Sequence, residues 1–249
     1  MQTVPENPAA KVVPDTASNL SKKAQVADMF NNIAGRYDFL NHFLSLGIDR
    51  GWRKKAIAEV AKTKPDTVLD VATGTGDMAI ATIAAYPCKI TGVDIAEQMM
   101  EIGRKKVTEK NLQQAITFQL ADSEQLPFPD ASFDRVSVAF GLRNMTHKDL
   151  ALGEMARVLR PGGKLLVLEF SKVAKPLEKA YDIYSFKVLP LLGRWVARDE
   201  DSYRYLAESI RMHPDQQALK DLMHNNGFSH VDIHNLSAGV VALHVGIKV

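Results

Sequence analysis

The chain has 249 residues, of which 46% are hydrophobic, and it carries a formal net charge of +2. This length and apolar content suffice for a full hydrophobic core, so we expect a single domain over residues 21–249. The small net charge, with Lys/Arg runs of only three residues, argues against a nucleic-acid partner. The single cysteine, Cys88, excludes an internal disulfide and a cysteine-based zinc cage, and we expect no metal site.

The sequence also allows predictions about the N-terminal segment and about membrane association. Residues 1–20 contain Pro5, Pro8 and Pro14 with few large apolar side chains, which predicts a disordered lead-in. No uninterrupted run of about 20 apolar residues occurs, so a spanning helix is not expected. Any membrane contact should therefore be peripheral, and we expect a cytoplasmic protein.

The first motif follows an apolar strand expected around Val68–Val71. It reads D-x-x-x-G-x-G, with Asp70 as the acid and Thr75 between Gly74 and Gly76. Glycines there let the backbone pass close to a ligand with no Cβ in the way, so we predict a nucleotide-binding loop. The same residues approach the dinucleotide fingerprint G-x-G-x-x-[GA], which keeps a nicotinamide or flavin enzyme as an alternative.

Asp70 favours one of these ligands. A carboxylate at the carboxyl end of the strand would repel a dinucleotide pyrophosphate, whereas the ammonium and sulfonium of S-adenosylmethionine would be attracted to it. We therefore predict S-adenosylmethionine as the cofactor. The alternative is a loop carboxylate that caps the following helix.

Asp94 ends the second expected strand, Lys89–Asp94, about 20 residues after the glycine loop. That is the spacing at which a carboxylate reaches a ribose diol, so we predict Asp94 as the ribose ligand. The alternative is an N-cap for a helix expected over Ile95–Val107, and one residue can fill both roles.

Asp122 and Ser123 follow the third expected strand, Ile116–Leu120. Ligands of open α/β sheets lie at the carboxyl ends of the strands, so we predict that both residues hydrogen-bond the adenine ring. The alternative for the pair is an ordinary polar turn between strand and helix.

The remaining pattern alternates strands and helices and ends in a hairpin with a short glycine-containing turn. It predicts an α/β fold of Rossmann-like type: a doubly wound, mostly parallel sheet with an antiparallel C-terminal strand. The expected elements are a strand at Phe133–Phe140, a helix at Asp149–Leu159, a turn at Arg160–Gly163, a strand at Lys164–Phe170, and hairpin strands at Val231–Leu236 and Val240–Val245.

At the level of a family, the glycine loop with Asp94, Asp122 and the Leu159–Gly163 turn resembles class I S-adenosylmethionine-dependent methyltransferases. Longer segments resemble the ubiquinone/menaquinone biosynthesis C-methyltransferase family (UbiE), over about residues 25–249. These segments are Tyr37–Asn41, Phe140–Asn144, Glu169–Ser171 and Asp201–Ile210.

The resemblance implies methyl transfer to a ring carbon of a polyprenylated benzoquinol or naphthoquinol, in ubiquinone and menaquinone biosynthesis. It also implies peripheral contact with the inner membrane and enzymes of quinone biosynthesis as partners. A methyltransferase for another small molecule, and less favourably a nicotinamide-dependent oxidoreductase, remain the alternatives.

Three residues are candidates for handling the substrate hydroxyl, because a quinol carbon is a weak nucleophile until a neighbouring hydroxyl loses its proton. Arg143, expected in the loop after the fourth strand, would stabilise the phenolate or organise water. Tyr37 would hydrogen-bond the hydroxyl and Asn144 would orient it. The alternatives are a salt bridge to a helix acid for Arg143, core packing with a satisfied hydroxyl for Tyr37 and a helix cap for Asn144.

A helical stripe between the fifth strand and the hairpin is the last candidate feature. We expect the stripe to pack on the sheet, and leave the apolar residues after it open as membrane or isoprenoid contacts. The stripe comprises Leu177, Tyr181, Tyr184 and Val188, and the residues after it are Leu191, Leu192 and Trp195.

Overall fold

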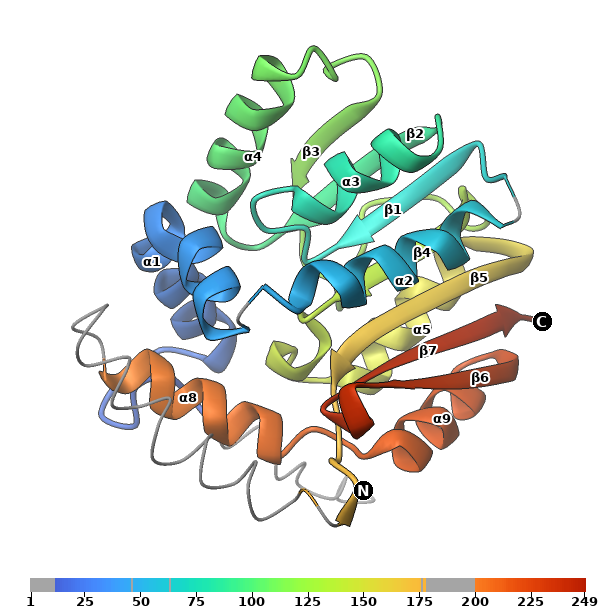
Figure 1. The fold of residues 1–249 in the computed structure, drawn as a ribbon. Helices are drawn as coiled ribbons and strands as arrows, with labels where there is room; N and C mark the ends of the chain where they lie inside the picture. Colours follow the sequence, from blue (N-terminus) through green and yellow to red (C-terminus); the bar gives the residue numbers. More distant parts are fainter. Residues whose placement is uncertain (1–11, 46, 63, 176, 178–199) are drawn as a thin grey trace.

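A seven-stranded sheet with helices on both faces forms the centre of the computed structural model, which describes residues 12–45, 47–62, 64–175, 177 and 200–249 (Figure 1). The strand order is β3-β2-β1-β4-β5-β7-β6. The strands are β1 (Thr67–Val71), β2 (Lys89–Asp94), β3 (Ile116–Leu120), β4 (Phe133–Ala139), β5 (Leu159–Phe170), β6 (Phe228–Leu236) and β7 (Val241–Lys248).

Strands β1 to β5 pair in parallel, whereas β7 runs antiparallel to both of its neighbours, β5 and β6. The final hairpin turns at Ser237–Gly239, so the predicted mostly parallel sheet with an antiparallel C-terminal strand is confirmed. The chain order moves outward from β1 to β3 on one side and from β4 to β5 on the other. The switch between β1 and β4 is where an open α/β sheet forms its ligand crevice.

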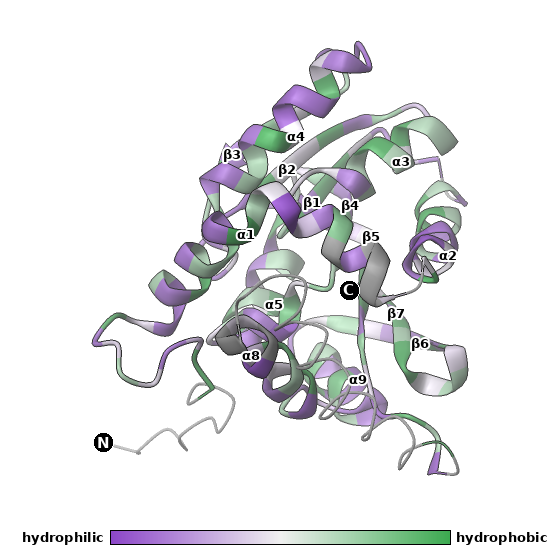
Figure 2. Cartoon of the chain, turned by 60° about the vertical axis from the view of Figure 1, so that its left-hand side comes forward, coloured by the Kyte–Doolittle hydropathy of each residue, from purple (hydrophilic) through white to green (hydrophobic). Residues whose placement is uncertain are grey.

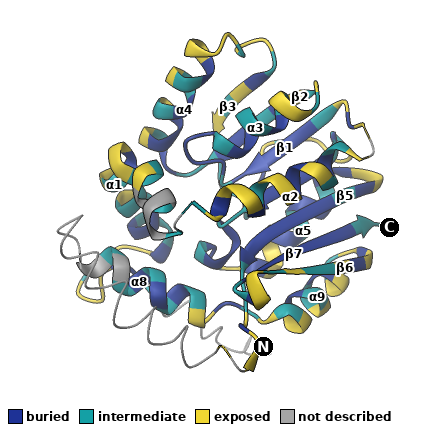
Figure 3. Ribbon diagram, in the orientation of Figure 1, coloured by how far each residue is buried: buried dark blue, intermediate teal, exposed yellow. Residues whose placement is uncertain are grey.

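Helices cover the two faces of the sheet in separate groups (Figures 1 and 3). Apolar side chains of α5 and α9 pack on one face, and those of α2 and α3 pack on the other. The described helices are α1 (Lys22–Leu44), α2 (Asp49–Ala61), α3 (Asp77–Ala85), α4 (Glu97–Glu109), α5 (Lys148–Val158), α8 (Glu200–Arg211) and α9 (Gln216–Asn225), with short 3-10 turns η2 (Leu142–Asn144) and η4 (Ser237–Gly239).

Strand β5 is covered by helices on both faces, which explains why its sequence is continuously apolar at the centre. Leu165 and Val167 belong to the core beneath α5 and α9, while Leu166 and Leu168 belong to the core beneath α2 and α3. A strand covered on both faces needs apolar residues at successive positions, as the sequence predicted.

Several expected boundaries differ from the structure; β6, for example, begins at Phe228 and not at Val231. The helix expected from Ile95 begins at Glu97, because Asp94 accepts the Ala96 N–H and holds the first residues outside the helix. The expected turn at Arg160–Gly163 is instead the first part of β5, which begins at Leu159. The register with β4 shifts here, because β5 advances from Leu159 to Lys164 while β4 advances only from Phe133 to Arg135.

Helix α1 lies across the carboxyl edge of the sheet, where it packs against the start of α4. The contact joins Ala34 of α1 to Ala96 and Met99, with Phe30 and Tyr37 of α1 packed around it. Figure 2 shows hydrophilic and hydrophobic segments alternating along both helices. Among the residues that the structure describes, no helix is long and apolar enough to cross a membrane.

Some of the predictions from the sequence concern residues that the structure does not describe. Residues 1–11 of the predicted lead-in lie outside the described residues. From the stripe and the segment after it, only Leu177 is described, and its side chain is exposed. The predictions for Tyr181, Tyr184, Val188, Leu191, Leu192 and Trp195 concern residues outside the described part.

Candidate active site

A pocket with an empty volume of about 730 Å³, part of it open to solvent, lies at the carboxyl ends of β1, β2, β3 and β4. Its size and its mixture of apolar walls with a few polar groups are typical of small-molecule sites. The lining residues are Lys23, Val26, Phe30, Tyr37, Val71, Ala72, Gly74, Val93, Asp94, Ile95, Met99, Ala121, Asp122, Ser123, Glu124, Ala139, Phe140, Gly141, Asn144, Met145 and Thr146.

Asp70 supports the glycine loop from inside and is not among the lining residues. One carboxylate oxygen accepts the Thr73 hydroxyl at 2.7 Å and the other accepts the Ser137 hydroxyl at 2.6 Å. Burial raises the pKa of the Asp70 carboxyl, and the two hydroxyl hydrogen bonds oppose that rise. The side chain thus ties the loop after β1 to β4.

Gly74 and Asp94 meet at the pocket wall. The Gly74 N–H donates to Asp94 Oδ2 at 2.8 Å, and the Ala96 N–H donates to Oδ1 at 2.9 Å. Burial raises the pKa of the Asp94 carboxyl, against the effect of these backbone donors. The carboxylate lies at the pocket wall, where the predicted ribose role is open to it, but it is not the N-cap of α4, which is Ala96 and has no side-chain cap.

Gly76 and Thr75 lie behind the wall rather than in it. Gly76 has a φ of +75°, and a Cβ there would approach the Phe118 ring to 2.7 Å. Only glycine fits such a position without a shift of its neighbours. The Thr75 hydroxyl donates to Asp38 of α1 at 2.6 Å, which joins the glycine loop to the helix across the site.

The loops after β1 and β4 approach each other closely at the bottom of the pocket. A Cβ on Gly141 would lie 2.4 Å from the Cβ of Ala72. Ala72 and Phe140 both have positive φ angles, 54° and 59°. Strained backbone of this kind concentrates at functional sites, where the surrounding structure holds it in place.

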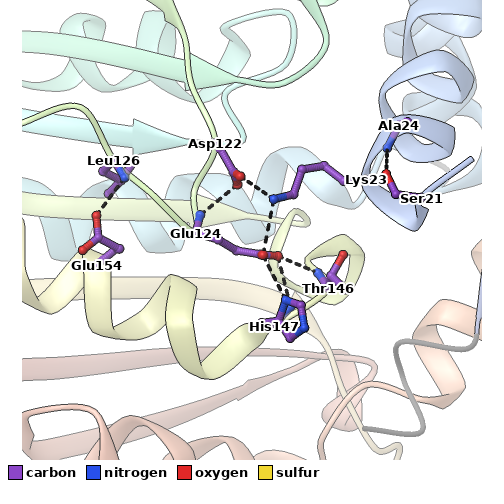
Figure 4. A network of polar contacts seen from close by, with 9 residues as sticks. All are labelled: Ser21, Lys23, Ala24, Asp122, Glu124, Leu126, Thr146, His147 and Glu154. Carbon is purple, nitrogen blue, oxygen red and sulfur yellow. Dashed lines mark hydrogen bonds and ion pairs between the residues drawn. The ribbon is translucent and has the colours of Figure 1, made fainter. Parts of the chain in front are cut away.

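Asp122 and Glu124 form a charged network with Lys23 of α1 (Figure 4). The Lys23 ammonium contacts Asp122 Oδ2 and lies 3.4 Å from Glu124 Oε2. Glu124 Oε1 accepts the N–H groups of Thr146 and His147, each at 3.0 Å. Helix α1 is thereby held to the loops after β3 and β4, on the adenine side of the predicted site.

Glu124 is stabilised in its charged form. Burial alone would raise the pKa of this carboxyl, but the backbone and side-chain hydrogen bonds from His147 and the charge of Lys23 outweigh that effect and lower the pKa. A carboxylate in such a setting stays ionised and fixes the two loops that it bridges.

Arg143 is buried in η2 and pairs with Glu169 at the end of β5. Its Nη1 lies 3.0 Å from Glu169 Oε1 and also donates to the carbonyl of Phe140. The guanidinium carbon lies 5.3 Å from the centre of the Phe170 ring. Arg143 does not line the pocket, and it forms a salt bridge, although with an acid on strand β5 and not with the helix acid of the alternative.

Asn144 and Tyr37 do line the pocket, from η2 and α1. Asn144 Oδ1 is buried and has no hydrogen-bond partner among the described residues. The Tyr37 ring packs edge-on against Phe30, with 5.8 Å between ring centres. Tyr37 therefore combines the packing expected from the alternative interpretation with a place in the pocket wall.

The structure brings together six of the predicted site residues in the pocket lining. They are Tyr37, Gly74, Asp94, Asp122, Ser123 and Asn144, whereas Asp70, Thr75, Gly76 and Arg143 lie behind it. Sequence reasoning missed Lys23, Phe30 and Glu124. Glu124 carried a usable signal, because it follows Asp122 by two residues at the same strand end, but Lys23 had none in the linear sequence.

Comparison with known proteins supplies the family. Residues 18–248 match the model of the ubiE/COQ5 methyltransferase family. The chain belongs to the ubiE/COQ5 methyltransferase family. It is 52% identical to the ubiquinone/menaquinone biosynthesis C-methyltransferase UbiE of Neisseria meningitidis serogroup C, over 94% of this chain and 95% of the relative. The enzyme of the same name from Burkholderia mallei SAVP1 is also 52% identical, over 94% and 96%.

Solved structures of proteins with low sequence identity to this chain share its fold. A methyltransferase of Thermotoga maritima, described as a possible histamine N-methyltransferase, superposes with a TM-score of 0.63 at 20% identity, covering 89% of this chain and 99% of that one. The [4+2]-cyclase SpnF superposes with a TM-score of 0.66 at 19% identity, covering 91% and 96%. At this identity the likeness shows the class I methyltransferase fold alone.

Proposed function

We propose that this protein transfers a methyl group from S-adenosylmethionine to a ring carbon of a polyprenylated benzoquinol or naphthoquinol. It is a C-methyltransferase of the ubiquinone/menaquinone biosynthesis type, as its family and its 52% identical relatives indicate. The observation that carries the proposal is the single pocket wall in which Gly74, Asp94 and Asp122 meet. Each of these residues comes from a different strand end.

The residues present fit the cofactor. We assign Asp94 to the ribose hydroxyls, because its carboxylate is held at the pocket wall by two backbone N–H groups. We assign Asp122 and Ser123 to the adenine, and Gly74 to the backbone that passes beside the cofactor without a Cβ. Asp70 acts on the methionine end through the loop that its two hydrogen bonds brace. When bound, S-adenosylmethionine supplies an electrophilic methyl group on a cationic sulfur.

The acceptor must be made more nucleophilic, because charge reaches the ring carbon only as a neighbouring hydroxyl loses its proton. Arg143 lies behind Asn144 with its charge already paired to Glu169, so we assign it to holding η2, and with it Asn144, in place. Asn144 Oδ1, with no partner among the described residues, is available to orient a substrate hydroxyl. We assign the Tyr37 hydroxyl, from α1, to a hydrogen bond with the substrate hydroxyl.

The polyprenyl tail of the substrate indicates where in the cell the enzyme acts. A polyprenyl chain stays in the bilayer, so we propose peripheral contact with the inner membrane from the cytoplasmic side, and contact with other enzymes of quinone biosynthesis. Such a contact predicts that the protein co-sediments with liposomes that contain the quinol and less with liposomes that lack it.

Calorimetric titration tests the cofactor assignment. We expect the wild type to bind S-adenosylmethionine and not NADH. Asp94→Ala should weaken binding by about 2 kcal/mol, or roughly 30-fold, since it removes a charged hydrogen-bond acceptor. Asp232→Ala, an exposed acid on β6, is the matched control and should bind as the wild type does. Binding of NADH alone would return the function to the oxidoreductase alternative.

Mass spectrometry tests the acceptor. A short-chain demethylated quinol, kept reduced, should gain one methyl group in a reaction that depends on S-adenosylmethionine. A protein that binds the cofactor but methylates neither the benzoquinol nor the naphthoquinol would favour a methyltransferase for another small molecule.

A further inference from the structure

Helix α1 supplies one wall of the pocket but buries few apolar side chains of its own. Val26, Phe30 and Tyr37 line the pocket at helical spacing, so one face of the helix is turned toward the ligand space. Among the described side chains of α1, the buried apolar ones are Val26 and Ala34. Because so little apolar burial contributes little to holding a helix in place, polar contacts decide where this wall stands.

Asp38 makes such contacts directly beside Tyr37. Its Oδ1 accepts the Thr75 hydroxyl of the glycine loop at 2.6 Å, and its Oδ2 contacts the ammonium of Lys106 on α4. Lys106 also lies 2.7 Å from Oδ1 of Asp77, the first residue of α3. One carboxylate thus joins α1 to the glycine loop, to α4 and, through Lys106, to the start of α3.

The surroundings of this carboxylate make its contacts effective. The side chains of Asp38 and Lys106 are 30% and 23% exposed, and ion pairs shielded to this degree are screened less than surface pairs. Thr75 is buried, and its neighbour Gly74 lines the pocket. The same short loop therefore faces the pocket with Gly74 and holds α1 with Thr75.

We propose that Asp38 is a positioning residue, which places Tyr37 for the acceptor by fixing this part of α1 to the glycine loop. Consecutive helical residues point about 100° apart, so Asp38 reaches the loop and α4 while Tyr37 faces the pocket. The aromatic contact of Tyr37 is with Phe30 of the same helix, so that contact does not fix the ring relative to the sheet.

The glycine loop is thereby the common reference for both reactants. It holds the cofactor side of the pocket through Gly74 and the acceptor side through Asp38 and Tyr37. A small displacement of a group that orients a substrate is enough to slow a reaction strongly. The inference rests on the proposed function, because Tyr37 needs an acceptor hydroxyl on which to act.

Steady-state kinetics test the role of Asp38. Asp38→Ala removes both contacts and should lower kcat with the quinol about tenfold or more, while the Kd for S-adenosylmethionine changes less than about threefold. Asp38→Asn keeps an oxygen for the Thr75 hydroxyl and should recover part of the rate. Asp28→Ala is the matched control, an exposed acid on the same helix, and should turn over like the wild type.

Thr75→Val is the decisive variant if Asp38→Ala does not fold, because it keeps the side-chain shape and removes only the hydroxyl. It should lower kcat about threefold or more. Wild-type kcat in Thr75→Val and in every folded Asp38 variant would refute the proposal.

A double-mutant cycle with Tyr37→Phe separates positioning from a general loss of structure. If Asp38 acts through the Tyr37 hydroxyl, Asp38→Ala should cost less than about threefold in the Tyr37→Phe background, against about tenfold in the wild-type background. An equal loss in both backgrounds would refute the positioning role. A Tyr37→Phe variant that turns over like the wild type would refute it too, since Asp38 would then have no group to place.

Amide hydrogen exchange is a second measurement that does not depend on the reaction. Exchange over residues 36–41 should be about tenfold faster in Asp38→Ala than in the wild type, while residues 23–27, at the end held by Lys23, exchange as before. Equal rates over residues 36–41 would refute the attachment. Absence of wild-type methylation with every quinol would instead count against the proposed function, and the exchange result would still decide whether Asp38 fixes the helix.

Discussion

The buried pair of Arg143 and Glu169 allows a stability prediction with a defined magnitude. Glu169 is 1% exposed, and its carboxylate accepts from Arg143 Nη1 at 3.0 Å, from the Arg143 N–H at 3.2 Å and from the Phe170 N–H at 2.9 Å. Glu169→Gln preserves the shape but leaves the guanidinium buried without its counter-charge. Breaking a buried pair in this way costs about 3 kcal/mol, near the low end of the measured range because the amide oxygen still accepts.

Urea and thermal unfolding measure that cost. At about 3 kcal/mol, a chain of this size should lose roughly 6–12 °C in Tm. Glu97→Gln is the control, because Glu97 also pairs with an arginine, Arg104, but their side chains are 46% and 35% exposed. Its loss should stay below about 1 kcal/mol. A midpoint for Glu169→Gln equal to that of the Glu97 variant would refute the argument from burial.

Three further perturbations follow from the same contacts. Gly141→Ala places a Cβ 2.4 Å from that of Ala72, so it should cost about 1–3 kcal/mol in urea unfolding and weaken S-adenosylmethionine binding in calorimetry. The lowered pKa of Glu124 makes its contribution to stability complete above about pH 4.5 and lost as pH falls below that value, so Glu124→Gln should flatten the decline of Tm in that acid range. The lowered pKa of His213 favours its neutral form in the folded state, so stability should fall as pH drops below 6.5, and His213→Leu should remove that part of the decline.

The sheet could be predicted from the sequence because its signals are local. Lys89–Asp94 and Ile116–Leu120 are short apolar runs bounded by polar turns, and both form strands with those bounds. The acids at the strand ends could also be placed, since the carboxyl ends of parallel strands share one edge of the sheet. Asp94 and Asp122 accordingly meet in the pocket.

The covering of the pocket by α1 could not be predicted, because its contacts join residues far apart in the sequence. Lys23 and Asp122 are separated by 99 positions, and Thr75 and Asp38 by 37. Neither pairing has a periodic or spacing signal. The burial of Arg143 was equally hidden, since its partner Glu169 stands on another strand, 26 positions away.

These long-range contacts change how the motif residues act. Thr75 was expected at the cofactor, but its hydroxyl is bonded to Asp38, which also contacts Lys106 of α4. At its other end α1 is held by Lys23 on Asp122 and Glu124. The helix over the pocket is thus attached to the glycine loop and to the adenine side by ion pairs and a hydroxyl. Because Asp122 is also the predicted adenine ligand, the ammonium of Lys23 and the adenine compete for one carboxylate, and Glu124 offers Lys23 a second partner while α1 stays in place.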